Sequence, residues 1–193
     1  MAESPAFESP VVRSYEFSSG GPLMLADASG TTKWLVRAET GGAAADRMDA
    51  PFGSSRAAGG GAFVMGSRPG EWIVVGPADA VAAVVAGLDG LDSSEFVTAL
   101  DWTHGRALFL VTGTDAPRML EKVCSLDWSD AMTPDGAVAS ASVAKVTCDI
   151  ARYDGDSAPT YMIFCDRSFG QYLFDALIDA GEEFGLAVGL PNG

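Results

Sequence analysis

Hydrophobic and polar residues follow one another along this chain in short patterns that predict many strands and few helices. Strands are expected where β-branched and aromatic residues lie between turn residues; these segments are 33–37, 62–65, 71–75, 106–111, 137–144, 145–153 and 160–165. Within 145–153, Val146, Cys148 and Ile150 alternate with polar residues, which predicts one face exposed to water. The turn Asp154-Gly155-Asp156 is expected to close a hairpin.

Three segments show the helical period instead, with apolar residues three and four positions apart. The first follows Pro77 and extends to Leu88. The second follows Thr114 or Asp115, either of which can cap it. The third follows Ser168, which with Gln171 has the spacing of a capping box. Residues 38–61 are rich in Gly and Ala and predict a helix fragment and a mobile loop.

The two halves of the chain resemble each other. Asp27-Ala28-Ser29 followed by Lys33-Trp34-Leu35-Val36 returns 74 residues later as Asp101-Trp102-Thr103 followed by Arg106-Ala107-Leu108-Phe109. Each half then has a strand that leads into a helix. This order predicts an α+β fold of duplicated ferredoxin-like (split β-α-β) halves. We expect a flexible N-terminal arm at 1–20, a first half at 21–90 and a second half at 91–193.

The charge of the chain excludes several classes of function. A net charge of −14 opposes binding to nucleic acid or to an anionic membrane, because both require a basic surface. The acidity fits either simple solubility or a docking surface for a basic partner. No apolar stretch reaches the ~20 residues of a membrane span, and the N-terminus lacks the pattern of a secretory signal. We therefore expect a cytoplasmic protein.

Few residues are suited to catalysis. Cys124, Cys148 and Cys165 lie far apart in apolar segments and are expected to be buried and reduced. His104 is the single histidine, and its setting before a strand favours a structural role over that of a catalytic base. The glycine-rich segment around Gly59-Gly60-Gly61 lacks the spacing of a dinucleotide-binding loop. No catalytic, cofactor-binding or metal site is expected in this chain.

Other residues are candidates for a partner interface or a structural motif. An arginine and an aromatic residue beside an exposed turn can anchor a partner, and this pattern occurs around Pro69-Gly70. Trp72 can equally pack in the core, and Ser168 can equally be a helix cap. The full set of candidates is Arg68, Glu71, Trp72, Asp101, Thr103, His104, Arg106, Arg167 and Ser168.

Together these motifs resemble the gamma subunit of heterotetrameric sarcosine oxidase. The resemblance spans residues 23–188 and is most specific at Asp101-Trp102-Thr103-His104-Gly105-Arg106-Ala107, followed by Gly113-Thr114-Asp115-Ala116. It implies a fold similar to the folate-binding domain of the glycine-cleavage aminomethyltransferase. It also implies an accessory subunit that stabilises a large alpha subunit in a flavin-dependent oxidase of sarcosine or a related N-methyl amine.

The resemblance further implies that this chain binds no cofactor itself. FAD, FMN, NAD and tetrahydrofolate are expected on partner subunits, within an assembly of alpha, beta, gamma and delta chains. Two alternatives remain: a stand-alone tetrahydrofolate-binding or aminomethyltransferase-like protein, and an interaction domain of an unrelated complex. The Lys-Gly-Cys signature of stand-alone folate-binding repair proteins is replaced here by Lys122-Val123-Cys124.

Overall fold

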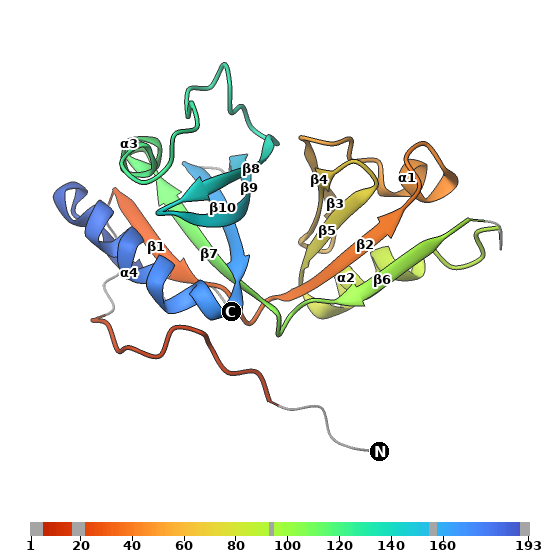
Figure 1. Ribbon diagram of the computed structural model, residues 1–193, viewed down its shortest axis with the longest axis horizontal. Coiled ribbons are helices and arrows are strands. Elements are labelled where there is room, and N and C mark those ends of the chain that lie inside the picture. Colours follow the sequence, from red (N-terminus) through yellow and green to blue (C-terminus); the bar gives the residue numbers. More distant parts are fainter. Residues whose placement is uncertain (1–5, 17–21, 93–94, 155–157, 190–193) are drawn as a thin grey trace.

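The computed structural model describes residues 6–16, 22–92, 95–154 and 158–189 of the 193-residue chain. Its strands form two sheets that lie face to face (Figure 1). The six-stranded sheet has the order β11-β1-β7-β10-β9-β8, with β1 Leu23–Asp27, β7 Arg106–Gly113, β8 Val138–Val143, β9 Val146–Asp154, β10 Pro159–Asp166 and β11 Ala187–Gly189. The five-stranded sheet has the order β3-β4-β5-β2-β6, with β2 Thr32–Ala38, β3 Ser55–Gly59, β4 Ala62–Arg68, β5 Glu71–Gly76 and β6 Val97–Asp101.

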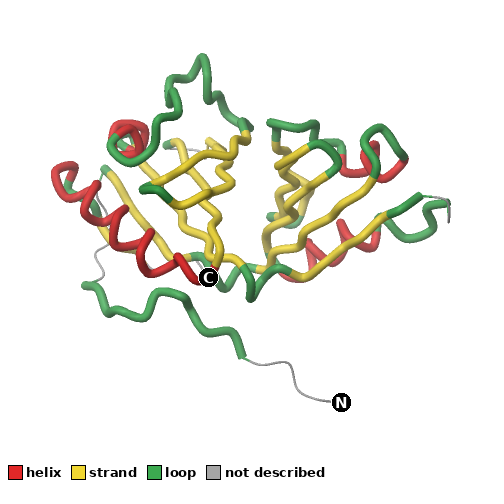
Figure 2. Tube along the Cα trace, viewed as in Figure 1, coloured by secondary structure: helices red, strands yellow, loops and turns green. Residues whose placement is uncertain are grey.

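Helices cover the outer face of each sheet (Figure 2). They are α1 Ala43–Met48 and α2 Ala78–Ala86 on the five-stranded sheet, and α3 Ala116–Glu121 and α4 Gly170–Gly181 on the six-stranded sheet, with short 3-10 turns at Arg167–Phe169 and Glu182–Phe184. Within the described residues, no helix has the length and apolar character needed to cross a membrane.

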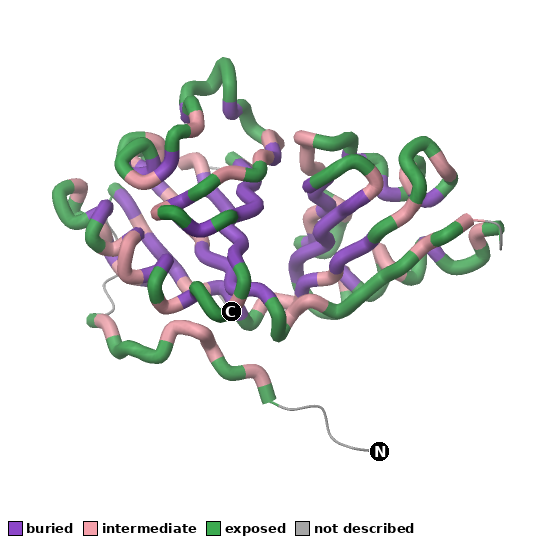
Figure 3. The backbone as a smooth tube through the Cα atoms, in the orientation of Figure 1, coloured by how far each residue is buried: buried purple, intermediate pink, exposed green. Residues whose placement is uncertain are grey.

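The alternation of side chains along each strand produces three hydrophobic layers. In β5, Trp72 and Val74 face the helices, whereas Ile73 and Val75 face the other sheet. Residues of β7 and β10 alternate in the same way, so a middle layer fills the space between the sheets. Figure 3 shows buried backbone in the central strands of both sheets. The predicted α+β class is therefore confirmed.

Both sheets have ferredoxin-like strand order, but each sheet contains one strand from the other predicted half of the chain. In the five-stranded sheet, β2-α1-β4-β5-α2-β6 gives the order β4-β5-β2-β6. In the six-stranded sheet, β7-α3-β9-β10-α4 follows the same path, and β1 occupies the place that corresponds to β6. A division at residue 90 therefore does not separate the sheets, because β1 lies in the second sheet and β6 in the first.

The two copies of the repeated motif lie at the strand crossing, where the chain passes from one sheet to the other. In each copy the aspartate carboxylate accepts a hydrogen bond from the backbone N–H two residues later, at 2.9 and 2.8 Å. The hydroxyl of Ser29 then accepts the backbone N–H of Leu108 at 3.0 Å, and that of Thr103 accepts the backbone N–H of Lys33 at 3.1 Å. The predicted duplication is thus present as a pair of reciprocal contacts.

Two predicted helices lie where expected, and the start of the third was predicted wrongly. Helix α2 begins at Ala78 after Pro77, and α3 begins at Ala116 after Asp115. Helix α4 begins only at Gly170, because Ser168 lies in the preceding 3-10 turn and forms no capping hydrogen bond. The amide oxygen of Gln171 instead accepts backbone N–H groups of the N-terminal arm.

Three further predictions differ from the structure. Residues 6–16 of the predicted flexible arm lie along α4, where Arg13 pairs with Asp175 at 2.7 Å. The predicted loop at 38–61 contains the strand β3, which pairs with β4. Asp149 was expected on a wet face and is buried. The expected arm residues 1–5 and 17–20 lie outside the described residues, as does most of the Asp154-Gly155-Asp156 turn.

Candidate functional site

The space between the two sheets is charged at one end and hollow at the other. On β4 and β5, Arg68 and Glu71 lie at the charged end, and Phe63 and Val75 line a pocket at the other. On β9, Asp149 lies at the charged end and Tyr153 lines the pocket. These residues share a face of their strands because they are separated by an even number of positions or by a bulge in β4.

An ionic cluster joins the sheets at the charged end. It consists of Arg37, Arg68, Glu71, Arg106, Asp149 and Asp166. Arg68 bridges the sheets, since its guanidinium donates to Glu71 at 2.6 Å and to Asp149 at 3.1 Å. Asp149 also accepts from Arg106 at 2.7 Å, and its side chain is only 3% exposed. A buried carboxylate needs such partners, because an unpaired charge is costly away from water.

The electrostatics of this cluster favour the ionised form of Glu71. Burial alone would raise the pKa of Glu71, but hydrogen bonds from Arg37 and Arg68 outweigh burial and lower the pKa below its ordinary value. The guanidinium of Arg106 also lies 4.9 Å from the centre of the Trp102 ring. Every acid in this cluster is thus held by an arginine, which is the arrangement of a structural joint.

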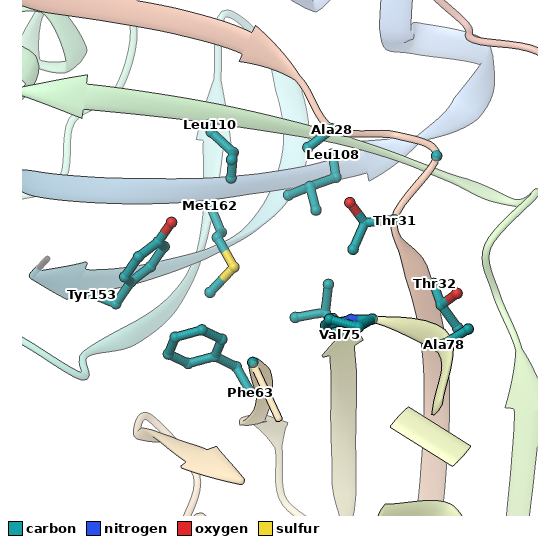
Figure 4. A pocket seen from close by; sticks show the side chains of 14 residues that line it. Ala28, Thr31, Thr32, Phe63, Val75, Ala78, Leu108, Leu110, Tyr153 and Met162 are labelled. Atoms are coloured by element: carbon teal, nitrogen blue, oxygen red, sulfur yellow. The ribbon is translucent and has the colours of Figure 1, made fainter. Parts of the chain in front are cut away.

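The pocket at the opposite end is apolar and has a volume of about 470 Å³. Leu110, Tyr153 and Met162 reach into it from the six-stranded sheet, and Phe63 and Val75 face them from the other sheet (Figure 4). The rings of Phe63 and Tyr153 lie 5.0 Å apart. Burial raises the pKa of Tyr153, with an opposing hydrogen bond from Thr160. The described residues that line this pocket carry no charged side chain.

Other reactive groups in the described part of the chain are sequestered. Cys124, Cys148 and Cys165 are buried and unpaired, as predicted. Burial raises the pKa of Cys148 to about 12 and that of Cys165 to about 11, which leaves both as unreactive thiols. Among residues 6–16, 22–92, 95–154 and 158–189, no group of three or more His, Cys, Asp or Glu side chains is arranged to hold a metal ion.

The candidates from the sequence lie in four places in the structure. Arg68, Glu71 and Arg106 meet in the ionic cluster. Asp101 and Thr103 lie at the strand crossing. Trp72 is buried in the core of the five-stranded sheet, where its indole N–H donates to the carbonyl of Ala50 at 2.8 Å.

The remaining three candidates lie where the N-terminal arm meets the rest of the molecule. His104 is exposed, and its ring lies 5.5 Å from that of Phe7. The guanidinium of Arg167 also lies over the Phe7 ring, 5.3 Å from its centre, and donates to the carbonyl of Glu8. Ser168 is exposed beside them. These contacts fasten the arm to the rest of the molecule.

Sequence reasoning missed the burial of several charged residues, among them Asp149 and Lys33. Asp149 was placed on a wet face, although its position opposite Arg68 joins the sheets. Lys33 is fully buried at the strand crossing, where its ammonium donates to the carbonyls of Ser29 and Thr31, both at 2.7 Å. Burial lowers its pKa to about 8 against the opposing influence of Asp27 and Asp101. No local signal marks a lysine in a strand as buried.

The two exchanged ferredoxin-like sheets, with helices outside and a pocket between them, define an α+β domain of the aminomethyltransferase folate-binding type. The family model described as the GCVT N-terminal domain matches residues 63–191. The chain belongs to this family, since the match covers well over half of its length.

Comparison with solved structures gives the same fold. A chain of heterotetrameric sarcosine oxidase from Corynebacterium sp. U-96 is similar with a TM-score of 0.72 and 22% identity, over 89% of this chain and 90% of that one. Glycine cleavage system aminomethyltransferase T from Bartonella henselae is similar with a TM-score of 0.62 and 15% identity, over 88% of this chain and 48% of that one. Among curated protein sequences, none matches closely enough to count as a relative.

Proposed function

We propose that this chain is the accessory gamma subunit of a heterotetrameric, flavin-dependent oxidase or dehydrogenase of sarcosine or a related N-methyl amine. The observation that carries the proposal is the extent of the likeness to the sarcosine oxidase chain, which covers about nine-tenths of both chains. The likeness to the aminomethyltransferase covers only 48% of that longer chain. The likeness thus spans nearly a whole chain of the first enzyme and about half of a chain of the second.

The chemistry of the site supports the same proposal. The arginines and acids between the sheets are paired with one another, and the three thiols are buried. These groups are engaged within the chain itself, which fits an accessory subunit. In this proposal FAD, FMN, NAD and tetrahydrofolate are bound by the alpha and beta subunits, and the assembly is cytoplasmic.

Affinity purification of the tagged chain from its own cells tests this function. We expect a large flavoprotein to co-purify in a fixed ratio, to show flavin absorbance and to oxidise sarcosine or another N-methyl amine. Omission of the tagged chain during co-expression should lower the yield of the soluble large subunit. A chain that remains alone and whose absence leaves that yield unchanged would contradict the proposal.

A stand-alone tetrahydrofolate-binding protein is the second candidate, and the pocket between the sheets is its specific support. Its apolar lining and Tyr153 could hold an aromatic ring. A folate also carries a pterin and a glutamate tail, which call for polar and charged partners that this lining does not supply. Calorimetry with tetrahydrofolate decides: we expect no heat of binding from the isolated chain, and saturable binding abolished by Tyr153→Ala would favour the second candidate.

A further inference from the structure

The outer edge of β6 is open. β6 is the last strand of the five-stranded sheet, and no strand in the described ranges pairs with its far side. Figure 3 shows β6 as exposed along most of its length. Leu100 is 57% exposed although it lies opposite the buried Leu35, and Phe96, just before the strand, is 69% exposed.

The internal duplication shows what this edge lacks. β1 and β6 are equivalent strands of five residues, each of which crosses to the sheet of the other half. The edge of β1 is covered, since β11 pairs with it in parallel and brings Val188 opposite Leu25. The same place beside β6 is vacant in the described structure. Leu25 is buried, whereas Ala99 at the equivalent position of β6 is exposed.

The sequence of β6 does not protect this edge against pairing. Natural edge strands are commonly blocked by lysine, proline, a bulge or an inward-pointing charge. The strand reads Val-Thr-Ala-Leu-Asp and pairs with β2 without a bulge. Trp102 donates its N–H to the carbonyl of Lys33, so by the alternation of an antiparallel ladder the N–H groups of Val97 and Ala99 point outward.

The charge around this edge indicates the chemistry of its occupant. From Asp89 to Asp101 the chain carries four acidic residues and no lysine or arginine. Arg37, on the neighbouring strand, is bound to Glu71 at 2.7 Å. A second copy of this chain would bring acidic segments together, and the whole chain carries a charge of −14. A basic partner is therefore favoured over self-association.

We propose that β6 is a docking edge for an extended segment of the partner flavoprotein, which adds a strand to the five-stranded sheet. The segment carries an apolar side chain against Leu100 and Phe96, and lysine or arginine at its ends beside the acidic residues. This inference rests on the proposed function. It identifies the surface that the assembly uses.

Two variants test the edge in the purified complex. Ala99→Pro removes an outward N–H, whereas the matched control Ala99→Val keeps it and suits a strand. We expect Ala99→Pro to weaken retention of the flavoprotein about tenfold, the effect of losing a main-chain hydrogen bond and its local geometry, and Ala99→Val to retain it. Leu100→Lys keeps the backbone intact, opposes a basic strand, and should also weaken retention. Thermal unfolding of each isolated variant verifies that it is folded.

The outcomes distinguish this inference from the proposed function. Weaker retention by the folded variants, together with wild-type affinity that falls as salt rises, supports a basic strand on β6. Wild-type retention by both Ala99→Pro and Leu100→Lys overturns the inference but leaves the subunit assignment intact. A wild-type chain that captures no flavoprotein overturns both. Self-association in sedimentation experiments that Ala99→Pro abolishes would make a second copy the occupant and overturn the choice of partner.

Discussion

Arg106 is held by two carboxylates that differ in burial and in their other partners, since Asp149 also accepts from Arg68. Asp149 and Asp166 both accept from it at 2.7 Å, but their side chains are 3% and 66% exposed. Asp149→Asn leaves a buried arginine short of a charge partner and should lower the free energy of unfolding by about 3–5 kcal/mol. Asp166→Asn, the matched control, should cost at most about 1 kcal/mol. Urea denaturation measures both, and equal losses would show that burial does not govern this cluster.

Lys33 gives the stability of the protein a pH dependence of its own. Its pKa falls from the ordinary 10.5 to about 8 in the folded chain, so between these values only the unfolded state holds the proton. Stability must then rise with pH across this window. We expect the rise to exceed that of Lys33→Met by about 1–3 kcal/mol.

The measurement is urea denaturation at about pH 7 and pH 10, on either side of most of this window. Lys145→Met changes an exposed lysine and should keep the wild-type rise. Parallel curves for wild type and Lys33→Met would mean that Lys33 is charged throughout.

At the level of elements, the strand crossing depends on two hydroxyls in equivalent places. Ser29 is fully buried and Thr103 is half-buried. Ser29→Ala leaves the backbone N–H of Leu108 without its acceptor and should cost about 1–3 kcal/mol. Thr103→Val removes the equivalent bond from the backbone N–H of Lys33, whose acceptor side chain is only half-buried, and should cost about 0.5–1.5 kcal/mol. Thermal unfolding compares them, and a larger loss for Thr103→Val would mean that the two crossings are not equivalent.

The sequence predicts the strands that carry their own pattern and misses those that depend on the other half. β5 and β10 are central and read as continuous apolar runs, so their positions were predicted closely. β1 and β6 are short strands near the edges of their sheets. The hydrophobic pattern of five residues does not indicate which sheet such a strand joins. The exchange is a property of pairing between distant segments, and it is visible only in the folded chain.

The same limit explains the candidate site. Alternation correctly placed Thr147 and Asp149 on one face of β9, and Thr147 is exposed. Whether that face meets water is decided by the second sheet, which covers Asp149 and brings Arg68 to it. Residues of the repeated motif could be identified because their spacing recurs. The pocket and the ionic cluster could not, since each is assembled from strands of both sheets.

At the scale of the whole molecule, the two sheets should unfold as one unit. They share a middle hydrophobic layer, exchange β1 and β6, and are joined by Arg68 and Asp149. A defect on one side should therefore destabilise the other. Leu177 is fully buried under the six-stranded sheet, and Leu177→Ala should cost about 2–5 kcal/mol.

Native-state hydrogen exchange measures how far this loss spreads. We expect the amides of Val74 in β5 and Ile163 in β10 to lose equal protection in Leu177→Ala, although only β10 belongs to the mutated side. Val81→Ala places a buried defect under the five-stranded sheet instead. It should likewise lower the protection of both amides equally, although only β5 belongs to the mutated side. Loss confined to the mutated side would instead mean that each sheet is stable alone, and that strand exchange and the ionic cluster add little coupling between them.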